Sequence, residues 1–511
     1  MSEKFFSIAL IGLDAVLIEV EADISRATLP VFKVVGLPDT SVREAQERIR
    51  AAIKNSGLPF PQARITVNLA PAHIKKEGSM HDLAMTLAII SATGGLTLPN
   101  QKRRVFLGEL ALDGSLRPFI GALPAVLAAL ENQATEVYFP AANREEVALA
   151  LDEMVSSKIN ALPAKSVTDV LLHLTGVQTI KPMTPDQQTI VVSNNKYPVD
   201  FAHVHGQALA KRALEIAAAG SHNVLMTGPP GSGKTMLARA LPSIFPPMTR
   251  EEALEVIKIR SVTGKLNLSG PNIERPFRSP HHTSSCVALI GGGSWPAPGE
   301  VSLAHRGVLF LDEFPEFPRH VLEALRQPLE DGFVTISRAQ CTLRFQARFS
   351  LVAARNPCPC GYASDPSHDC TCQPTELLRY QRKISGPLLE RIDLHLKVPR
   401  VDPNELLKCR PSETSDMIRQ RVIAARNRMS IRLSDENAFT NADMDHRLIT
   451  EHCSLNNETE NFLCAATDRL KLSARSVKRT LKVARTIADL SGSDQITQEH
   501  LAEALQFRSH V

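Results

Sequence analysis

One stretch decides the fold of this chain: Gly228-Pro229-Pro230-Gly231-Ser232-Gly233-Lys234-Thr235. It follows an apolar run at 223–226 and precedes a helix-forming run at 236–241, which predicts a strand-to-helix turn. Its glycines allow backbone N–H groups to approach phosphate oxygens at a helix N-terminus, where four donors lack partners. Lys234 would reach the β- and γ-phosphates, and the Thr235 hydroxyl would bind Mg²⁺. The stretch therefore predicts an ATP-binding phosphate loop.

A second motif supplies carboxylates to the same site. Residues 307–313 read Gly-Val-Leu-Phe-Leu-Asp-Glu, which predicts a buried parallel strand that ends in Asp312 and Glu313. Asp312 would hold Mg²⁺, and Glu313 would orient or deprotonate the attacking water. Apolar runs that end in acidic residues are common, so this signal gains its weight from the phosphate loop upstream.

A third strand, predicted at 349–354, ends near Asn356. An amide at that strand tip can bind both the γ-phosphate and the lytic water. A phosphate-loop strand, then a carboxylate strand, then a strand with a polar tip is the order of an AAA+ core, which is a P-loop α/β fold.

The chain has 511 residues, too many for one hydrophobic core, and several domains are expected. Alternating strand-like and helical runs over 1–175 predict an α+β domain, with a helix at 42–55 capped by Asp39-Thr40-Ser41. Residues 176–199 are polar and rich in proline, which predicts a linker. We expect the ATPase core at 200–400 and a small all-α lid at 401–511.

Composition narrows the cellular context. Hydrophobic residues make up 43% and charged residues 22%, as in ordinary folded proteins. The net charge of +4 is small, so a DNA-binding surface would have to be local. No run of 18 apolar residues and no secretory signal is present, which predicts a cytoplasmic protein with no membrane partner.

Four of the nine cysteines gather in one short segment: Cys358, Cys360, Cys370 and Cys372. Four thiolates in a turn-rich segment predict a tetrahedral Zn²⁺ site, although spacers of two residues are commoner than the single residues here. Four protein ligands leave no open position, so the zinc is expected to be structural. Two alternatives remain: His368 replaces one cysteine, or the thiols are free or redox-active.

Further motifs carry a family resemblance. They include Asp-Phe-Ala-His-Val-His-Gly-Gln at 200–207, Arg-Ser-Pro-His-His-Thr at 278–283 and Asn-Pro-Cys-Pro-Cys-Gly at 356–361. The sequence resembles the Mg-chelatase-related AAA+ proteins and, within that group, the YifB/ComM proteins, over nearly the entire chain. ComM-type members are hexameric helicases that drive DNA branch migration during natural transformation. The chain departs from the family pattern at His203 and His205, and at Arg355, which places an unexpected charge beside Asn356.

The resemblance also assigns two arginines. Arg391, in Leu-Leu-Glu-Arg-Ile-Asp at 388–393, resembles the arginine finger that reaches a neighbouring subunit's γ-phosphate. Arg475 resembles the second sensor, which acts on the nucleotide from the lid. Each would stabilise charge that develops during phosphoryl transfer. Alternatively, Arg391 forms an ordinary salt bridge with Asp393 or Glu390, and Lys478 or Arg479 takes the place of Arg475.

Two insertions are candidates for DNA contact. Alternating residues at 333–337 and 342–345 predict a β-hairpin that carries Arg338 and Arg344. The resemblance places this hairpin, and a second insertion at 263–299 that includes Lys265, in the pore of a hexamer. Contacts there would be to the backbone phosphates of single-stranded or branched DNA, so binding should be salt-sensitive and sequence-neutral. Alternatively, the hairpin arginines only protect an edge strand from aggregation.

The first domain resembles the C-terminal domain of Lon protease, an S5-domain-2-like fold. The match rests on residues 68–79, 107–110 and 121–123. Lon uses a Ser–Lys dyad, whereas Met80 and Pro124 occupy the matching places here. Proline offers no amine to activate a hydroxyl, so proteolysis is not expected. A shifted dyad of Ser79 with Lys75 or Lys76 remains an alternative.

An ATP-driven DNA motor is therefore the leading interpretation of the sequence. A chelatase motor would use the same ring to insert metal into a porphyrin, but its usual metal-binding partner segment, Asp-x-Ser-x-Ser, is missing here. A protease would need the dyad. A remodelling ATPase would hydrolyse ATP without acting on DNA, and only the basic residues of the predicted hairpin argue against it.

Overall fold

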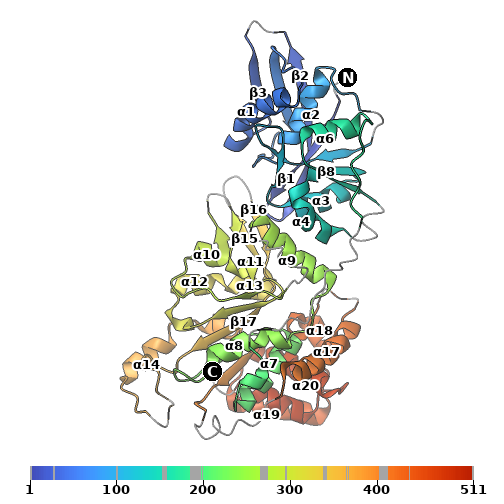
Figure 1. The fold of residues 1–511 in the computed structure, drawn as a ribbon. Helices are drawn as coiled ribbons and strands as arrows, with labels where there is room; N and C mark the ends of the chain where they lie inside the picture. Colours follow the sequence, from blue (N-terminus) through green and yellow to red (C-terminus); the bar gives the residue numbers. More distant parts are fainter. Residues whose placement is uncertain are drawn as a thin grey trace. The chain divides into compact units, whose positions relative to one another are not determined.

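A computed structural model of the chain describes residues 3–26, 29–98, 102–151, 158–184, 197, 199–264, 274–293, 296–337, 342–363, 365, 368–401, 413–434, 436 and 438–508. The chain divides into two units (Figure 1). The first comprises Met1–Val191 and Arg250–Ile273, and the second comprises Val192–Thr249 and Glu274–Val511. The segment Arg250–Ile273, which linear reasoning placed in the ATPase core, therefore belongs with the first unit.

A mixed seven-stranded sheet forms the centre of the first unit, in the order β3-β4-β2-β1-β5-β8-β9. Antiparallel pairing joins β1 to β2 and β2 to β4, and parallel pairing adds β5, β8 and β9 on the other side of β1. The strands are β1 (Phe5–Ile11), β2 (Asp14–Ser25), β3 (Val31–Val35), β4 (Arg64–Ala70), β5 (Arg104–Phe106), β8 (Glu136–Pro140) and β9 (Asn160–Ala164).

Among the described residues of this unit, the α-helices are α1 (Thr40–Asn55), α2 (Asp82–Ala92), α3 (Ala122–Glu131), α4 (Arg144–Ala150), α6 (Val167–Leu174) and α9 (Arg250–Val262). The predicted cap of α1 is confirmed, because Oδ1 of Asp39 accepts a hydrogen bond of 2.8 Å from the backbone N–H of Val42. In α9, Ile257 packs with Leu123 and Ala150, and Ser261 donates to Glu146 over 2.5 Å. These contacts explain why α9 belongs with this unit.

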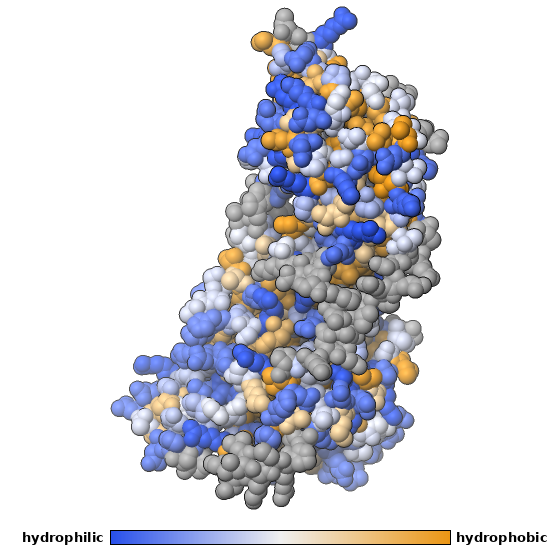
Figure 2. Space-filling view, in the orientation of Figure 1, coloured by the Kyte–Doolittle hydropathy of each residue, from blue (hydrophilic) through white to orange (hydrophobic). Residues whose placement is uncertain are grey.

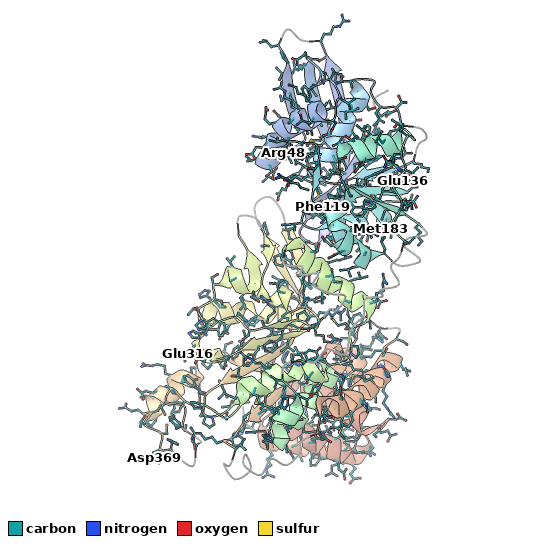
Figure 3. All side chains as sticks on the ribbon, viewed as in Figure 1. Arg48, Phe119, Glu136, Met183, Glu316 and Asp369 are labelled. Carbon is teal, nitrogen blue, oxygen red and sulfur yellow. The ribbon has the colours of Figure 1, made fainter. Side chains whose placement is uncertain are left out.

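Two carboxylates in the first unit are buried beside an arginine. Glu136, labelled in Figure 3, accepts from Nε of Arg104 over 2.8 Å and from the hydroxyl of Tyr138 over 3.0 Å. Asp82 accepts from Nε of Arg48, also over 2.8 Å. Burial raises the pKa of Asp82 to about 6, against the opposing effect of Arg48.

The second unit contains a five-stranded parallel sheet in the order β11-β14-β17-β10-β18. Its strands are β11 (Phe277–Arg278), β14 (Val308–Leu311), β17 (Ser350–Arg355), β10 (Val224–Thr227) and β18 (Leu394–Lys397). Thr227 lies opposite Arg355, and Leu311 lies opposite Ala353. This register brings the phosphate loop, Asp312 and Asn356 to the same carboxyl edge, where parallel α/β sheets bind ligands.

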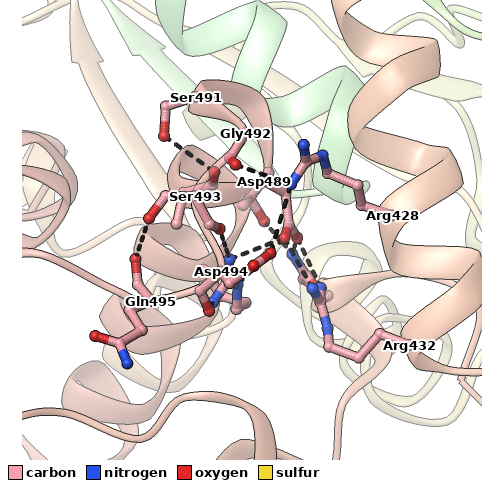
Figure 4. Close-up of polar contacts among 12 residues, drawn as sticks. Arg428, Arg432, Asp489, Ser491, Gly492, Ser493, Asp494 and Gln495 are labelled. Atoms are coloured by element: carbon pink, nitrogen blue, oxygen red, sulfur yellow. Dashed lines mark hydrogen bonds and ion pairs between the residues drawn. The ribbon is translucent and has the colours of Figure 1, made fainter.

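Helices of the predicted lid region belong to the same unit as this sheet: α17 (Ser415–Arg432), α18 (His446–His452), α19 (Asn457–Leu470), α20 (Ala474–Ser491) and α21 (Gln498–Gln506). Figure 4 shows how Asp489 of α20 is held by arginines. Arg432 of α17 binds both carboxylate oxygens, over 2.8 and 2.7 Å, and Arg485 binds Oδ1. This buried network joins the two longest lid helices and satisfies a carboxylate that is almost fully enclosed.

The surface is typical of a folded globular protein. On the face shown in Figure 2, hydrophobic residues occur in small groups among hydrophilic ones. Among the described residues, no helix combines the length and the apolar character needed to cross a bilayer.

Candidate active site

The phosphate loop connects β10 to α8 (Lys234–Ala240), as the sequence predicts. Gly233 has a φ of +88° and directly precedes α8, a backbone conformation that favours glycine. A Cβ atom on Gly228 would lie 2.1 Å from the carbonyl oxygen of Val398, so no larger residue fits. The loop thus follows a path that only its glycines permit.

The Lys234 amine lies inside this loop. Its Nζ donates to the carbonyl oxygens of Gly228 and Pro229, over 2.7 and 2.9 Å, and lies 3.3 Å from Oδ1 of Asn356. The side chain is buried, and burial lowers its pKa below the usual lysine value. The amine is therefore held between the loop and the predicted sensor amide, where a phosphate oxygen would meet both.

Thr235 and Asp312 come together from separate elements. The Thr235 hydroxyl, in the first turn of α8, donates to Oδ2 of Asp312 over 2.9 Å. Asp312 directly follows β14, and β17 lies between that strand and β10. Hydroxyl and carboxylate oxygens are the ligand type that Mg²⁺ binds, so this pair fits the predicted magnesium position.

Glu313 occupies a distinctive position. Its φ of +50° is rare for a residue with a side chain, and its N–H donates to Oδ1 of Asp312 over 2.9 Å. Its carboxylate lies 3.0 Å from Nδ1 of His282, whose ring contacts that of His281 at a centroid separation of 4.1 Å. Reasoning from the sequence assigned His282 to a pore insertion and missed this contact, although the motif at 278–283 was a signal for it.

Arg355, the unexpected charge beside Asn356, points toward the sheet. Its Nε donates to the hydroxyl of Thr227 over 3.0 Å, and burial lowers its pKa. Arg355 and Asn356 line a cavity of about 180 Å³ together with Tyr380 and the ends of β10 and β18. The arginine therefore supports the strand below the phosphate loop.

The two arginines assigned by resemblance share one carboxylate. Arg391 is nearly fully buried, donates to the carbonyl of Pro387 over 2.8 Å and forms an ion pair with Glu330. Arg475 is half-exposed and lies 3.6 Å from the other oxygen of Glu330 and 3.4 Å from Glu390. Two carboxylates were expected as alternative salt-bridge partners of Arg391, and both pair with other arginines. Asp393 pairs with Arg479 over 2.5 Å, and Glu390 pairs with Arg475.

Both arginines lie at the amino edge of the sheet. Asn223, which directly precedes β10, donates from Nδ2 to the carbonyl oxygen of Arg391 over 3.2 Å. The extended chain from Asn223 to Gly228 spans about 16 Å, so the phosphate loop lies at the opposite edge. Neither arginine contacts the phosphate loop of its own chain in this arrangement. Glu330 was not singled out from the sequence, where no motif marks it.

The predicted hairpin is present as β15 (Phe333–Ser337) and β16 (Thr342–Gln346), with Thr335 opposite Arg344. Arg344 is exposed, and its guanidinium lies 3.4 Å from the ring centroid of Phe333. Arg338 and Lys265, the other candidates for DNA contact, lie outside the described residues. In the second insertion, Arg278 is paired with Glu300. Its Nε donates to Oε2 of Glu300 over 2.5 Å, and its Nη2 donates to Oε1 over 2.7 Å.

The four predicted metal-ligating cysteines lie together in the segment 358–372, here called the cysteine knuckle. Their sulfur atoms all lie within 4.8 Å of one another, and the separations among those of Cys358, Cys360 and Cys370, 3.2 to 3.8 Å, exceed a disulfide bond length. A Zn²⁺ ion with four sulfur ligands at about 2.3 Å needs sulfur–sulfur separations of about 3.8 Å. The donor set therefore fits zinc. His368, the alternative ligand, instead stacks on Tyr362 at 4.9 Å.

In the first unit, the side chains of the alternative dyad have separate partners. The Ser79 hydroxyl donates to Glu109, and the buried Lys76 amine donates to the carbonyl of Pro71. Lys75 pairs with Glu77 over 3.7 Å. This arrangement gives the Ser79 hydroxyl a carboxylate acceptor.

Comparisons with known proteins agree with this geometry. Three family profiles match: "Magnesium chelatase, subunit ChlI" over residues 200–406, "Subunit ChlI of Mg-chelatase" over 20–143 and "Magnesium chelatase, subunit ChlI C-terminal" over 412–508. The chain is 43% identical to Competence protein ComM of Haemophilus influenzae over 510 residues, which cover 99% of this chain and 97% of that protein. It is 42% identical over 503 residues to the protein YifB of Escherichia coli, covering 98% and 96%. Magnesium-chelatase subunit ChlI of Euglena gracilis is 24% identical over 188 residues, covering 32% and 54%.

Proposed function

Because the chain belongs to the YifB/ComM family of Mg-chelatase-related AAA+ ATPases, we propose that it is an ATP-driven, hexameric DNA motor. It moves the branch point of branched DNA and so assists the integration of incoming DNA during natural transformation. It acts in the cytoplasm. The observation that supports this proposal is the match to ComM over 99% of the chain together with a phosphate loop, two carboxylates and a sensor amide gathered at one sheet edge.

The residues divide the work of hydrolysis among them. The phosphate loop and Lys234 bind the phosphates, and Thr235 with Asp312 holds Mg²⁺, which neutralises phosphate charge. Glu313 accepts the proton of the attacking water, and Asn356 orients that water against the γ-phosphate. Arg391 and Arg475 serve the site of a neighbouring subunit, since both lie at the sheet edge opposite their own phosphate loop.

DNA passes through the pore of the ring, where Arg338, Arg344 and Lys265 bind backbone phosphates. The exposure of Arg344 on the hairpin supports this role. The first unit has a Lon-C-terminal-like fold without protease activity, and it assembles the ring or guides DNA into it. The pairing of Ser79 with Glu109 supports the absence of proteolysis.

A structural zinc ion completes the set of cofactors. Cys358, Cys360, Cys370 and Cys372 hold it, and the clustering of their sulfur atoms supports the assignment. The ion contributes no reaction step, because four protein ligands leave no open position for substrate.

A second function is favoured by a separate observation, the three matches to magnesium-chelatase subunit profiles. In that case the same ring remodels a protein or a metal-insertion partner instead of DNA. The two functions differ in what stimulates ATP hydrolysis. A chelatase-like motor responds to a protein partner and is indifferent to DNA structure.

The deciding experiment measures ATP hydrolysis and strand separation on a synthetic four-way junction, beside single-stranded and duplex DNA. Glu313→Gln is the control, because it retains the phosphate loop and loses the base. We expect junction processing that requires ATP and disappears in the control. ATP turnover that is indifferent to every DNA would contradict the motor and favour the remodelling function.

A further inference from the structure

The cysteine knuckle packs directly against the phosphate loop. Gly361 has a φ of +92°, and a Cβ atom at this position would lie 2.7 Å from Cδ of Pro230 and 2.8 Å from Cγ. Real Cβ atoms do not approach other carbons this closely, so only glycine lets the knuckle backbone reach the Pro230 ring. Pro230 is the third residue of the phosphate loop. One wall of that loop is therefore built by the knuckle.

The residue that touches Pro230 also binds a cysteine. The N–H of Gly361 donates to Sγ of Cys358 over 3.2 Å, and the N–H of Ala363 donates to the same sulfur over 3.3 Å. Hydrogen bonds of this kind favour a thiolate and orient it toward a metal. The position of Cys358 thus fixes the position of Gly361.

A second connection runs from the knuckle to the other side of the loop. Asp365 of the knuckle pairs with Arg400 over 3.1 Å. Arg400 lies two residues after Val398, whose carbonyl oxygen faces Gly228. The phosphate loop is consequently held near Gly228 by the extension of β18 and at Pro230 by the knuckle, and these two supports are joined to each other.

We propose that zinc bound by the four cysteines sets the affinity of the phosphate loop for ATP through the contact between Gly361 and Pro230. This inference deepens the ATPase function proposed above and rests on it. Without the metal ion, nothing joins the four cysteine side chains, so the knuckle no longer holds Gly361 against Pro230. ATP must then order the loop itself, which weakens binding. Thermodynamic linkage requires the reverse effect, in which bound ATP slows the loss of zinc.

The test uses the full-length protein, with zinc measured by elemental analysis and nucleotide affinity measured by the fluorescence of MANT-ATP with Mg²⁺. Gly361→Ala places a methyl group against Pro230 while all four cysteines remain. Gly176→Ala is the matched control, because Gly176 also has a positive φ, +76°, but a Cβ atom there would meet nothing within 4 Å. Lys234→Ala shows the MANT-ATP signal that remains when specific binding at the phosphate loop is lost. Wild-type protein stripped of zinc by a chelator supplies the metal-free state.

We expect Gly361→Ala to retain about one zinc ion per chain yet to bind MANT-ATP about tenfold more weakly, a coupling of ordinary size. The affinity of the zinc-stripped protein for MANT-ATP should fall by a similar factor and recover when zinc is added. Gly176→Ala should bind MANT-ATP as the wild type does. Excess MANT-ATP should also slow zinc release to the chelator.

Wild-type affinity in both the stripped protein and Gly361→Ala would overturn the proposal, as would a purified protein that holds no zinc and does not respond to it. If Gly361→Ala fails to fold, Pro230→Ala tests the same contact from the other side. Its affinity for MANT-ATP should no longer respond to zinc, and a retained response would contradict the proposal. Failure of the DNA motor is separately visible, as normal zinc-dependent binding of MANT-ATP without any junction processing.

Discussion

Nδ1 of His282 lies 3.0 Å from Oε2 of Glu313. A residue of the segment after β11 therefore contacts the carboxylate that is expected to activate water. Glu313 also has a φ of +50°, so its side chain projects from a turn that few residues adopt. Such a side chain needs a partner to fix its direction, and His282 provides one.

We expect His282→Phe, which keeps an aromatic ring but removes the nitrogen that faces Glu313, to lower kcat for ATP hydrolysis about tenfold with KM little changed, because only the orientation of Glu313 is lost. Steady-state kinetics at several ATP concentrations would separate the two constants. His281→Phe is the matched control, since it keeps a ring against His282. A higher kcat in His282→Phe would instead show that His282 restrains Glu313.

The roles of Lys234 and Glu313 predict two different defects. Lys234→Ala removes the amine that lies between the phosphate loop and Asn356, so nucleotide binding should be lost. Glu313→Gln should bind MANT-ATP normally but lower turnover by about 10²- to 10⁴-fold, as expected for loss of a general base. Equilibrium binding and single-turnover hydrolysis distinguish the two. Normal turnover in either variant would show that the site is wrongly assigned.

The position of Arg391 and Arg475 at the amino edge predicts complementation between subunits. Arg391→Ala and Lys234→Ala should each be inactive alone. When mixed and reassembled, they should recover about a quarter of the wild-type ATPase rate, because an intact loop then meets a neighbour's intact arginine. Arg475→Ala should behave in the same way. If no activity returns on mixing although mass measurements show mixed rings, the arginines do not act on a neighbour.

The buried carboxyl group of Asp393 is expected to make the stability of the second unit depend on pH. Burial alone would raise the pKa of this carboxyl group, but its interactions with Arg479, His222 and Arg508 outweigh that effect and hold the pKa well below its usual range. Because the pKa is lower in the folded state, the unfolded chain binds more protons at acid pH. The stabilisation is therefore complete above the unfolded pKa of about 4 and is lost as the pH falls below it.

Asp393→Asn should lower the free energy of unfolding of the second unit by about 3 kcal/mol near pH 7, as for other broken buried ion pairs. Below pH 4, the free energy of unfolding of the variant should fall less steeply than that of the wild type. The difference should correspond to the protonation of about one carboxyl group. Hydrogen exchange at β10 and β18 across this pH range measures both effects. If the free energy of unfolding falls as steeply below pH 4 in the variant as in the wild type, Asp393 does not have this role.

A substitution of Arg344 tests the proposed DNA-binding surface. Arg344→Ala should weaken binding to single-stranded DNA and reduce the slope of log affinity against log salt by about one phosphate contact, equally for all sequences. Arg344→Lys keeps the charge but changes the cation–π contact with Phe333, so it should retain the salt slope. Fluorescence anisotropy at several salt concentrations reports the slope. A loss of affinity with no change in slope would indicate a structural role on the hairpin.

The arrangement of the candidate nucleotide site could be predicted from local sequence. The phosphate loop, Asp312, Glu313 and Asn356 stand at the ends of apolar runs, and a parallel sheet brings such ends to one edge whatever the remaining details. The same reasoning gave the cap of α1 within residues 39–41, where the structure places it at Asp39. These features depend on neighbours in sequence, so periodicity and capping rules were sufficient.

Other features depend on residues far apart in the chain, and the tertiary structure alone decided them. Glu330 pairs with Arg391 across 61 positions, Pro230 packs against Gly361, and α9 joins the first unit although it follows the phosphate loop in sequence. No local pattern encodes such pairings, because an ion pair or a close backbone contact requires only that two chemically ordinary residues meet in space. The sequence by itself determined which groups are proposed to bind and cleave ATP, and the fold decided which partners hold those groups in place.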